Sequence, residues 1–243
     1  MEIIMIRAIL AILFAIVFLI LSLPIYAVTA LLRKKHPLAI DRFSQDLVCW
    51  ALRVIKAICC VDLEVRGQEN LPEDQSVLYI ANHASIFDVI LVYPLLPGLT
   101  GFLAKKELEK VPSLNLWLKR IHGLFLDRKD PKQGLKTILT AIEQVKNGIS
   151  VFIFPEGTRT KDGKLGEFKA GSFKVASRSK CPIVPIAIEN TADIVRKHIP
   201  FVKSTHVTIT FGKPILMDEL DADQKKHIGR YVQAIVQDML DHA

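Results

Sequence analysis

The first sixty residues contain two long apolar segments, and the first of these is uninterrupted. From Ala8 to Leu32 the chain carries no charged residue. A helix of this length extends roughly 37 Å at about 1.5 Å per residue, enough to cross the about 30 Å hydrocarbon core of a bilayer. The pattern therefore predicts a membrane helix. Pro24 lies within it, so a kinked or re-entrant helix that enters only one leaflet is the alternative.

The residues after this segment indicate whether it is retained and how it is oriented. A cleaved signal peptide would have a shorter apolar core, about 7–15 residues, followed by a small-residue cleavage site. Here Arg33-Lys34-Lys35 follows, which is typical of a stop-transfer flank. We therefore expect a retained anchor. The positive-inside rule places the rest of the chain on the cytoplasmic side of the cell membrane.

The second apolar segment runs from Phe43 to Asp62 and has one wide apolar face, interrupted by Arg53 and Lys56. Such a helix either lies in the headgroup region of a membrane or packs as a core helix of the following domain. Periodicity alone does not distinguish these two interpretations. We expect residues 1–60 to form an N-terminal membrane-anchoring helical segment.

Residues 61–243 are expected to form one α/β domain, because short apolar runs alternate with amphipathic segments. The predicted strands are Leu63–Gly67, Ser76–Ala81, Thr100–Ala104, Gly123–Asp127, Ser150–Phe154, Ile183–Glu189 and Val207–Gly212. The predicted helices are Ile86–Tyr93, Pro112–Arg120, Pro131–Asn147, Gly171–Ser179 and Ala222–Leu240. Two of the strands are almost wholly apolar, as strands buried on both faces are. The predicted architecture is therefore a mostly parallel or mixed sheet flanked by helices.

The charge is concentrated in the centre of the chain. The net charge of the whole chain is +7, and residues 101–180 contain 17 Lys or Arg against 8 Asp or Glu. This excess suits anionic lipid or an acidic substrate. Nucleic acid is not an expected partner, because no helix-turn-helix, zinc or ribonucleoprotein signature accompanies the charge. The four cysteines form no C-x-x-C pair, so we expect free thiols and no metal site.

The first candidate motif is Asn82-His83-Ala84-Ser85-Ile86-Phe87-Asp88, which directly follows a predicted strand. A carboxylate five residues after a histidine, across a strand-to-helix turn, can hold imidazole Nδ1–H and leave Nε2 free to accept a proton. The structural alternative is that Ser85 and Asp88 form a helix capping box. Both interpretations are open at this point.

The second motif is Phe154-Pro155-Glu156-Gly157-Thr158-Arg159, after the apolar strand at 150–154. Ligands of open α/β sheets bind beyond the carboxyl ends of the strands. Gly157 permits a sharp turn there, and Arg159 can offer a planar fork to phosphate. The alternative is a turn in which Glu156 and Arg159 merely pair with each other.

Two more strand ends carry cations. Arg128 ends the segment Gly123-Leu124-Phe125-Leu126-Asp127-Arg128, and Lys105 follows the predicted strand at 100–104. Each of these residues alone is typical of a solvated surface. Together they predict one edge of the sheet with a histidine and several cations.

In this order, the motifs resemble those of the glycerolipid acyltransferase family, whose members include 1-acylglycerol-3-phosphate acyltransferases. NHASIFD is similar to the family's Asn-His-x-x-x-x-Asp signature and FPEGTR to its Glu-Gly-Thr-Arg block. FLDR at 125–128, IVPIAI at 183–188 and AKKEL at 104–108 are similar to three further blocks. The resemblance covers about residues 10–215. One departure is that His122 stands where many members have a glycine, and Gly123 comes one residue later.

The resemblance implies an enzyme that transfers a fatty acyl group from acyl carrier protein or acyl-CoA to the sn-2 hydroxyl of 1-acylglycerol-3-phosphate (lysophosphatidic acid), giving phosphatidic acid. His83 would be the general base, and Asp88 would orient it. Substrate would be bound by the remaining motif residues, which are Lys105, Arg128, Glu156, Gly157, Thr158 and Arg159. No metal or organic cofactor is expected.

Three other functions are compatible with parts of the pattern. The nearest is an acyltransferase for another lysolipid or for glycerol-3-phosphate. A non-catalytic lipid-binding membrane protein would not require the His83 and Asp88 pair. A hydrolase that releases fatty acid would be expected to carry a G-x-S-x-G elbow, which this sequence lacks.

Overall fold

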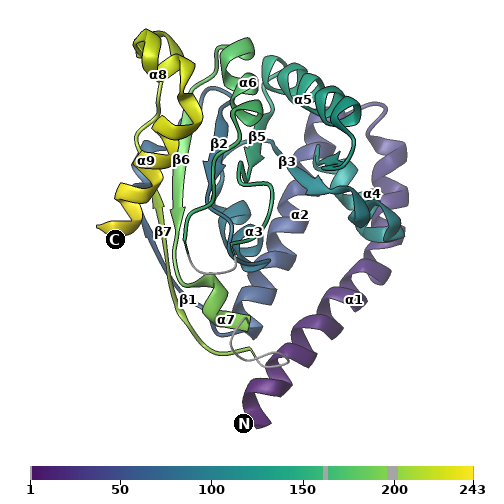
Figure 1. Ribbon diagram of the computed structural model, residues 1–243. Helices are drawn as coiled ribbons and strands as arrows, with labels where there is room; N and C mark the ends of the chain where they lie inside the picture. The colour runs from purple at the N-terminus through teal and green to yellow at the C-terminus, as the bar shows by residue number, and fades with distance from the viewer. Residues whose placement is uncertain (1, 161–163, 196–201, 243) are drawn as a thin grey trace.

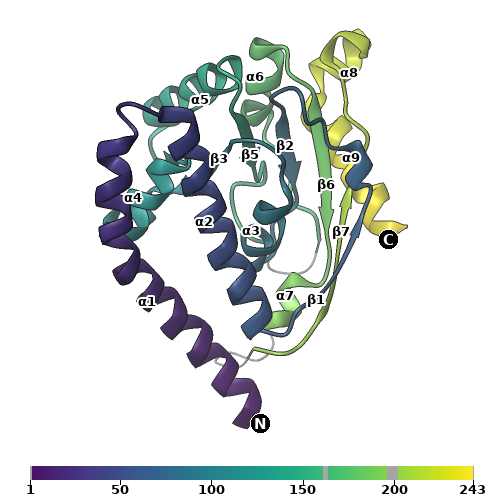
Figure 2. The ribbon, with the colours of Figure 1, turned by 180° about the vertical axis from the view of Figure 1, so that it is seen from behind.

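A seven-stranded sheet forms the centre of the molecule (Figures 1 and 2). The computed structural model describes residues 2–160, 164–195 and 202–242. The strand order is β1-β7-β6-β2-β5-β3-β4, and neighbouring strands are parallel except for β6 and β7. The strands are β1 (Asp62–Arg66), β2 (Leu78–Ala81), β3 (Thr100–Lys105), β4 (Leu124–Leu126), β5 (Ser150–Ile153), β6 (Ile183–Ile188) and β7 (His206–Phe211). The predicted mixed, mostly parallel α/β fold is confirmed.

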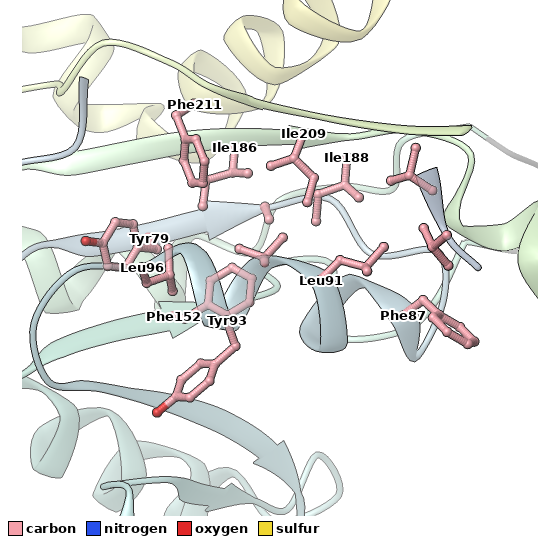
Figure 3. Close-up of a cluster of buried hydrophobic side chains, with 14 of the residues drawn as sticks. Tyr79, Phe87, Leu91, Tyr93, Leu96, Phe152, Ile186, Ile188, Ile209 and Phe211 are labelled. Carbon is pink, nitrogen blue, oxygen red and sulfur yellow. The ribbon is translucent and has the colours of Figure 1, made fainter. Parts of the chain in front are cut away.

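Two helical layers cover the sheet. The helices are α1 (Glu2–Leu32), α2 (Pro37–Ile58), α3 (Phe87–Val92), α4 (Pro112–Arg120), α5 (Pro131–Lys146), α6 (Ala170–Ser179), α7 (Thr191–Val195), α8 (Ala222–Lys226) and α9 (Ile228–Asp241). Short 3₁₀ turns lie at Gln68–Asn70, Tyr93–Leu95, Lys106–Lys110 and Met217–Glu219. One hydrophobic core joins the sheet to α2, α3 and α7 (Figure 3), and the other joins it to α5, α6 and α9.

The central strands are buried because both of their faces are covered. Every residue of β2, β5 and β6 is buried, which explains why their sequences are apolar runs without a polar alternation. Because β2, β3, β4 and β5 are parallel to one another, their carboxyl ends lie at one edge of the sheet. The candidate motifs follow these four strands.

The two N-terminal helices form an antiparallel hairpin on one side of the domain (Figure 2). The helix α2 packs as a core helix of the domain, which is one of the two interpretations of its sequence, and its position in the headgroup region stays a prediction. Its inner face is part of the core, where the Gln45 side chain bonds to Gly98 O at 2.5 Å and accepts from Thr100 N at 2.9 Å. Its outer face carries Trp50, which packs on Phe14 and Phe18 of α1.

The helix α1 is long and apolar enough to cross a membrane, over Ile6–Leu32, and only 11% of its most apolar window is buried. Large side chains such as Leu21 (67% exposed) and Leu31 (70% exposed) cover its outer surface. Soluble monomeric proteins rarely expose a contiguous apolar surface of this size to water. The helix therefore associates with a membrane.

Three elements differ from the sequence prediction. The helix α7 was not predicted, because its five residues are too short for a periodic pattern. The single C-terminal helix predicted over Ala222–Leu240 is two helices, α8 and α9, with a break at His227. The helix α3 begins at Phe87 and has no side-chain cap at its N-cap residue, although Phe87 N–H donates to Ser85 Oγ at 3.3 Å.

Candidate active site

His83 lies just past the end of β2, and the segment before it is fixed to the neighbouring strand. The Asn82 amide donates to Ile188 O and accepts from Ile188 N–H, both at 2.8 Å. These two bonds continue the pairing of β2 with β6 by one residue beyond the strand. Asn82 therefore sets where the chain leaves the sheet, a structural role that the sequence did not reveal.

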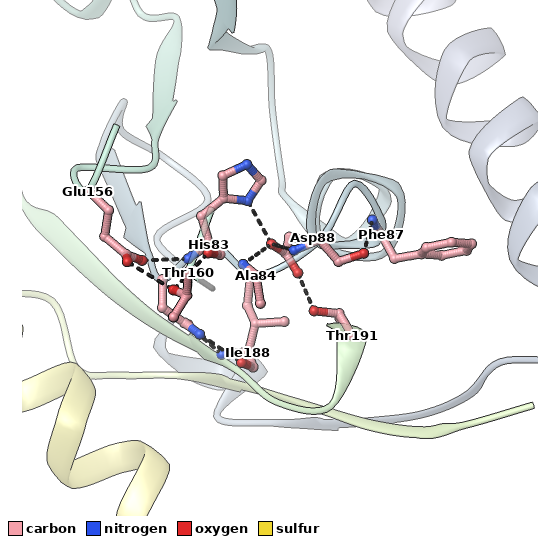
Figure 4. Close-up of polar contacts among 10 residues, drawn as sticks. His83, Ala84, Phe87, Asp88, Glu156, Thr160, Ile188 and Thr191 are labelled. Carbon is pink, nitrogen blue, oxygen red and sulfur yellow. Dashed lines mark hydrogen bonds and ion pairs between the residues drawn. The ribbon is translucent and has the colours of Figure 1, made fainter. Parts of the chain in front are cut away.

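The side chains of His83 and Asp88 form the polar centre of this turn (Figure 4). His83 Nδ1 lies 2.7 Å from Asp88 Oδ2, and the Asp88 side chain is fully buried. The same oxygen accepts the backbone N–H groups of Ala84 at 2.7 Å and Ser85 at 2.8 Å. An ionised carboxylate accepts only, so Nδ1 carries the proton and Nε2 is left as a base.

Both sequence interpretations of Asp88 thus hold for one oxygen atom. It binds two backbone N–H groups of the turn, as a capping carboxylate does, and it also orients the imidazole of His83. The two bonds from the backbone N–H groups immobilise the Asp88 carboxylate and so fix its distance from the His83 imidazole.

Thr191, the first residue of α7, completes the bonding of this carboxylate. Its hydroxyl donates to Asp88 Oδ1, and its side chain is buried. The sequence separation of 103 residues explains why no local pattern could identify this contact.

The Phe154-to-Arg159 turn holds His83 from the other side. The His83 ring stacks on Phe154 with 4.0 Å between the ring centroids. Glu156 Oε1 accepts the backbone N–H of His83 at 2.7 Å, and Thr160 N–H donates to His83 O at 2.8 Å. The two candidate motifs of the sequence are therefore joined directly through the backbone of the candidate base.

The carboxylate of Glu156 is fully used within the protein. Its second oxygen accepts Gly166 N–H at 2.9 Å and the Thr160 hydroxyl at 3.1 Å, and the side chain is buried. Within the described residues it makes no ion pair with Arg159, so the alternative of a simple Glu156–Arg159 pair is wrong. Glu156 stabilises the backbone of the site through these hydrogen bonds and does not line its cavity.

A cavity of 1320 Å³ opens in front of the His83 imidazole. Among the predicted site residues it is lined by His83, Lys105, Arg128, Gly157, Thr158 and Arg159. Asp88 and Glu156 lie behind this lining. Much of the remaining wall is apolar and comes from four helices and β3, with Leu52, Ile90, Leu103, Leu118, Leu135 and Ile138 among its residues.

Among the described residues, five cations line the cavity and are here called the cationic rim: Lys105, Arg128, Arg159, Lys169 and Lys174. Burial lowers the pKa of Arg128, and the charge of Arg159 lowers it further, while Glu107 acts in the opposite direction. The guanidinium remains charged, because an arginine pKa is far above neutrality. Two like charges held near each other favour binding of an anion.

The members of the rim differ in their partners. Lys105 Nζ lies 3.0 Å from Glu107 Oε1, and both side chains are more than half exposed. In the part of the chain that the structure describes, Arg128, Arg159 and Lys169 form no ion pair with a carboxylate. Because their charges are not neutralised in this way, Arg128, Arg159 and Lys169 are stronger candidates than Lys105 for binding an anionic ligand.

His122, the departure from the family pattern, adopts the left-handed conformation with φ +60°. That conformation favours glycine and explains why a glycine is expected in this turn. The His122 ring instead reaches the N-terminal hairpin, where Nε2 lies 3.1 Å from Asp41 Oδ2. Asp41 is buried and also forms a two-pronged pair with Arg33, at 2.5 and 2.9 Å. The turn before Arg128 is thus in contact with the hairpin.

No group of three His, Cys, Asp or Glu side chains that could hold a metal ion is found among the described residues. The four cysteines are free, and burial raises the pKa of the Cys49 thiol to about 11. A buried thiol of this kind is a poor nucleophile at neutral pH.

Comparison with known proteins relates the whole domain to one family. The Acyltransferase family profile matches residues 62–189. The chain is 32% identical over 192 residues to the 1-acyl-sn-glycerol-3-phosphate acyltransferase of Saccharomyces cerevisiae, an alignment that covers 77% of this chain and 62% of that protein. It is 33% identical to the protein of the same name from Cocos nucifera, over 67% of this chain and 53% of the relative. The chain thus spans about half to three fifths of the length of these two relatives.

A solved structure has the same fold. The 1-acyl-sn-glycerophosphate (LPA) acyltransferase PlsC from Thermotoga maritima superposes with a TM-score of 0.84 at 24% sequence identity. The match covers 98% of this chain and 94% of that one, so it includes the N-terminal hairpin as well as the sheet.

Proposed function

We propose, from the premise that this chain belongs to the Acyltransferase family, that it transfers a fatty acyl group from an acyl thioester to the sn-2 hydroxyl of 1-acylglycerol-3-phosphate. The product would be phosphatidic acid, an intermediate of phospholipid synthesis. The names of the relatives from yeast and coconut support this acceptor.

One observation carries the proposal: an oriented histidine base faces a cavity that also presents cations with no ion pair among the described residues. His83 Nδ1 is held by a buried carboxylate, and its ring lines the same cavity as Arg128 and Arg159. A general base and an anion site in one cavity are what the acylation of a phosphate-bearing alcohol requires.

The chemistry needs few further groups. His83 Nε2 takes the proton of the acceptor hydroxyl while the oxygen attacks the thioester carbonyl. The tetrahedral intermediate then collapses, the ester bond forms, the carbon–sulfur bond breaks, and the thiol leaves with the proton returned by the imidazolium. The negative Asp88 stabilises that imidazolium. A thioester is already activated, so no enzyme nucleophile is required.

The cationic rim would bind the acceptor through its phosphate. Arg128 and Arg159 can each form a two-pronged contact with phosphate oxygens, which a lysine cannot. Lys105 stands at the exposed edge, where its pair with Glu107 must open before it can contribute. Gly157 and Thr158 form the turn that presents Arg159 to the cavity.

The N-terminal hairpin would hold the cavity at the membrane surface. The helix α1 contacts α4 of the catalytic domain along its C-terminal half: Trp117 Nε1 donates to Ser22 Oγ at 2.8 Å and Arg120 donates to Thr29 Oγ1 at 3.1 Å. Phe18 also contacts α4, with 6.3 Å between its ring centroid and that of Trp117. Of the apolar span that begins at Ile6, only the part up to Val17 is therefore clear of α4, roughly 18 Å of helix at about 1.5 Å per residue, less than the about 30 Å core. We therefore infer that α1 enters one leaflet, with residues 61–243 on the cytoplasmic face.

The test is acyl transfer to lysophosphatidic acid by the protein in detergent or nanodiscs, with long-chain acyl-CoA or acyl carrier protein as donor. The wild type should form phosphatidic acid, and His83→Ala should lose about 10²- to 10⁴-fold in rate, the share of a general base. Acylation of a different lysolipid only would overturn the acceptor assignment. Absence of acylation with every acceptor and both donors would favour a lipid-binding protein.

A further inference from the structure

Lys169, like Lys174, is a residue of the cationic rim that lies outside the family motifs. It directly precedes α6, and its side chain lines the cavity with His83 and Arg159. Its backbone is fixed, because Lys169 N–H donates to Pro155 O at 3.1 Å. The position before it, Phe168, is buried, and its N–H donates to Gln233 Oε1 of α9 at 3.1 Å. A rigid segment therefore carries this lysine.

The Lys169 side chain passes over the α-carbon of Gly157. A β-carbon at position 157 would lie 2.9 Å from Lys169 Nζ, 3.5 Å from Cε and 3.8 Å from Cδ. Gly157 has φ +73°, a conformation that other residues adopt only with strain. Glycine at this position thus does two things: it permits the turn, and it leaves the space that the ammonium group of Lys169 occupies.

The ammonium group has no carboxylate partner among the described residues. The carboxylate of Glu156, next to Gly157 in the chain, is buried and accepts hydrogen bonds from His83, Gly166 and Thr160 with its two oxygens. A cation held in a defined place over a turn, without a counter-ion, is suited to a ligand that brings negative charge.

The place of Lys169 indicates which phosphate it would bind. In the acceptor, the attacking hydroxyl and the phosphate are separated by only two glycerol carbons and an ester oxygen. The phosphates of a thioester donor lie at the far end of a long pantetheine arm. Gly157 is adjacent to Glu156, whose carboxylate accepts the backbone N–H of His83, so Lys169 lies over the turn that holds the base and lines the same cavity.

We propose that Lys169 binds the phosphate of the acceptor beside Arg128 and Arg159, using the space above Gly157. This inference rests on the proposed acyl transfer. It adds a third cation to the acceptor site and gives Gly157 a role in substrate binding beyond its turn conformation.

The experiment compares Lys169→Met with the wild type and with Lys136→Met, an exposed lysine of α5 outside the cavity lining. Initial rates are measured against each substrate in turn. For Lys169→Met the KM for lysophosphatidic acid should rise about 10- to 100-fold, the range for losing a charged hydrogen bond. The KM for the donor and the thermal unfolding temperature should stay unchanged, and Lys136→Met should match the wild type in all three.

Two kinetic results would overturn the proposal: an unchanged KM for the acceptor, or a rise confined to the donor. If the wild type acylates no acceptor, the proposed function fails, and Lys169 is then tested without turnover. Calorimetric titration with glycerol 3-phosphate serves this purpose. Weaker binding by Lys169→Met than by Lys136→Met would support the phosphate site, and equal binding would exclude it.

Discussion

His83 and the cationic rim face the same cavity, yet they differ in how far the protein itself satisfies their bonds. Behind His83, one buried carboxylate receives two backbone N–H groups, the imidazole and the hydroxyl of Thr191. Across the cavity, Arg128, Arg159 and Lys169 form no ion pair with the residues described. The comparison teaches that the base is organised before substrate arrives, whereas the rim is completed by the substrate.

The largest effect should come from removing the charge behind the base. Asp88→Asn keeps an oxygen for the N–H groups of Ala84 and Ser85, and its amide can donate to the Thr191 hydroxyl. The fold should therefore survive while the imidazolium loses its counter-ion, lowering kcat by about 10²- to 10⁴-fold. Steady-state kinetics and thermal unfolding of the same preparation check this prediction. A kcat near that of the wild type would show that Asp88 only caps the turn.

A smaller effect, on binding of the acceptor, should follow from removing one charge of the cationic rim. Arg159→Met removes a planar donor without a protein partner, so we expect the KM for the acceptor to rise about 10- to 100-fold with a lesser change in kcat. Arg178→Met is the matched control, because Arg178 is exposed on α6 and outside the cavity lining. An equal loss in both variants would mean that overall charge, and not a defined contact, is responsible.

Loss of the Glu156 hydrogen bonds to the turns around His83 should reduce mainly the stability of the fold. Glu156→Gln turns one of two accepting oxygens into a donor, which leaves a buried N–H of His83 or Gly166 without an acceptor. We expect a loss of about 1–3 kcal/mol in the free energy of unfolding, the cost of one buried unsatisfied group. Chemical denaturation measures it, with exposed Glu219→Gln as the control. Equal stability of the two variants would argue against this support role.

The smallest effect concerns the contact between the hairpin and the turn before Arg128. Burial lowers the pKa of His122, Arg33 lowers it further, and Asp41 opposes both. Because the folded pKa lies below the value of 6.5 expected in the unfolded chain, unfolding takes up a proton at acidic pH. This contribution to stability is therefore present above about pH 6.5 and is lost as the pH falls towards the lower folded pKa.

His122→Asn isolates that contribution, since asparagine tolerates the left-handed conformation and does not titrate. Between roughly pH 7 and pH 5, the free energy of unfolding should fall more for the wild type than for this variant. Denaturation curves at both pH values provide the measurement. Parallel pH dependence of the two proteins would assign the effect to other groups.

The sequence by itself determined the features that depend on local pattern. The uncharged run from Ala8 to Leu32 specifies a long apolar helix, and apolar runs such as Val151-Phe152-Ile153 specify buried strands. Parallel strands end at a common edge, so the order of the motifs was enough to predict that His83, Arg128 and Arg159 line one cavity.

Only the tertiary structure decided how those residues share their bonds. Thr191 reaches Asp88 across 103 residues, and Glu156 reaches the backbone of His83 across 73. The resemblance to the family predicted Glu156 among the substrate-binding residues. The direction of its side chain, however, depends on which hydrogen-bond donors the folded chain brings to it. The sequence places Lys169 in a basic loop before a helix, but its position over Gly157 exists only when α6 docks beside the turn. Periodicity encodes which face of an element is buried; it does not encode which distant polar groups meet there.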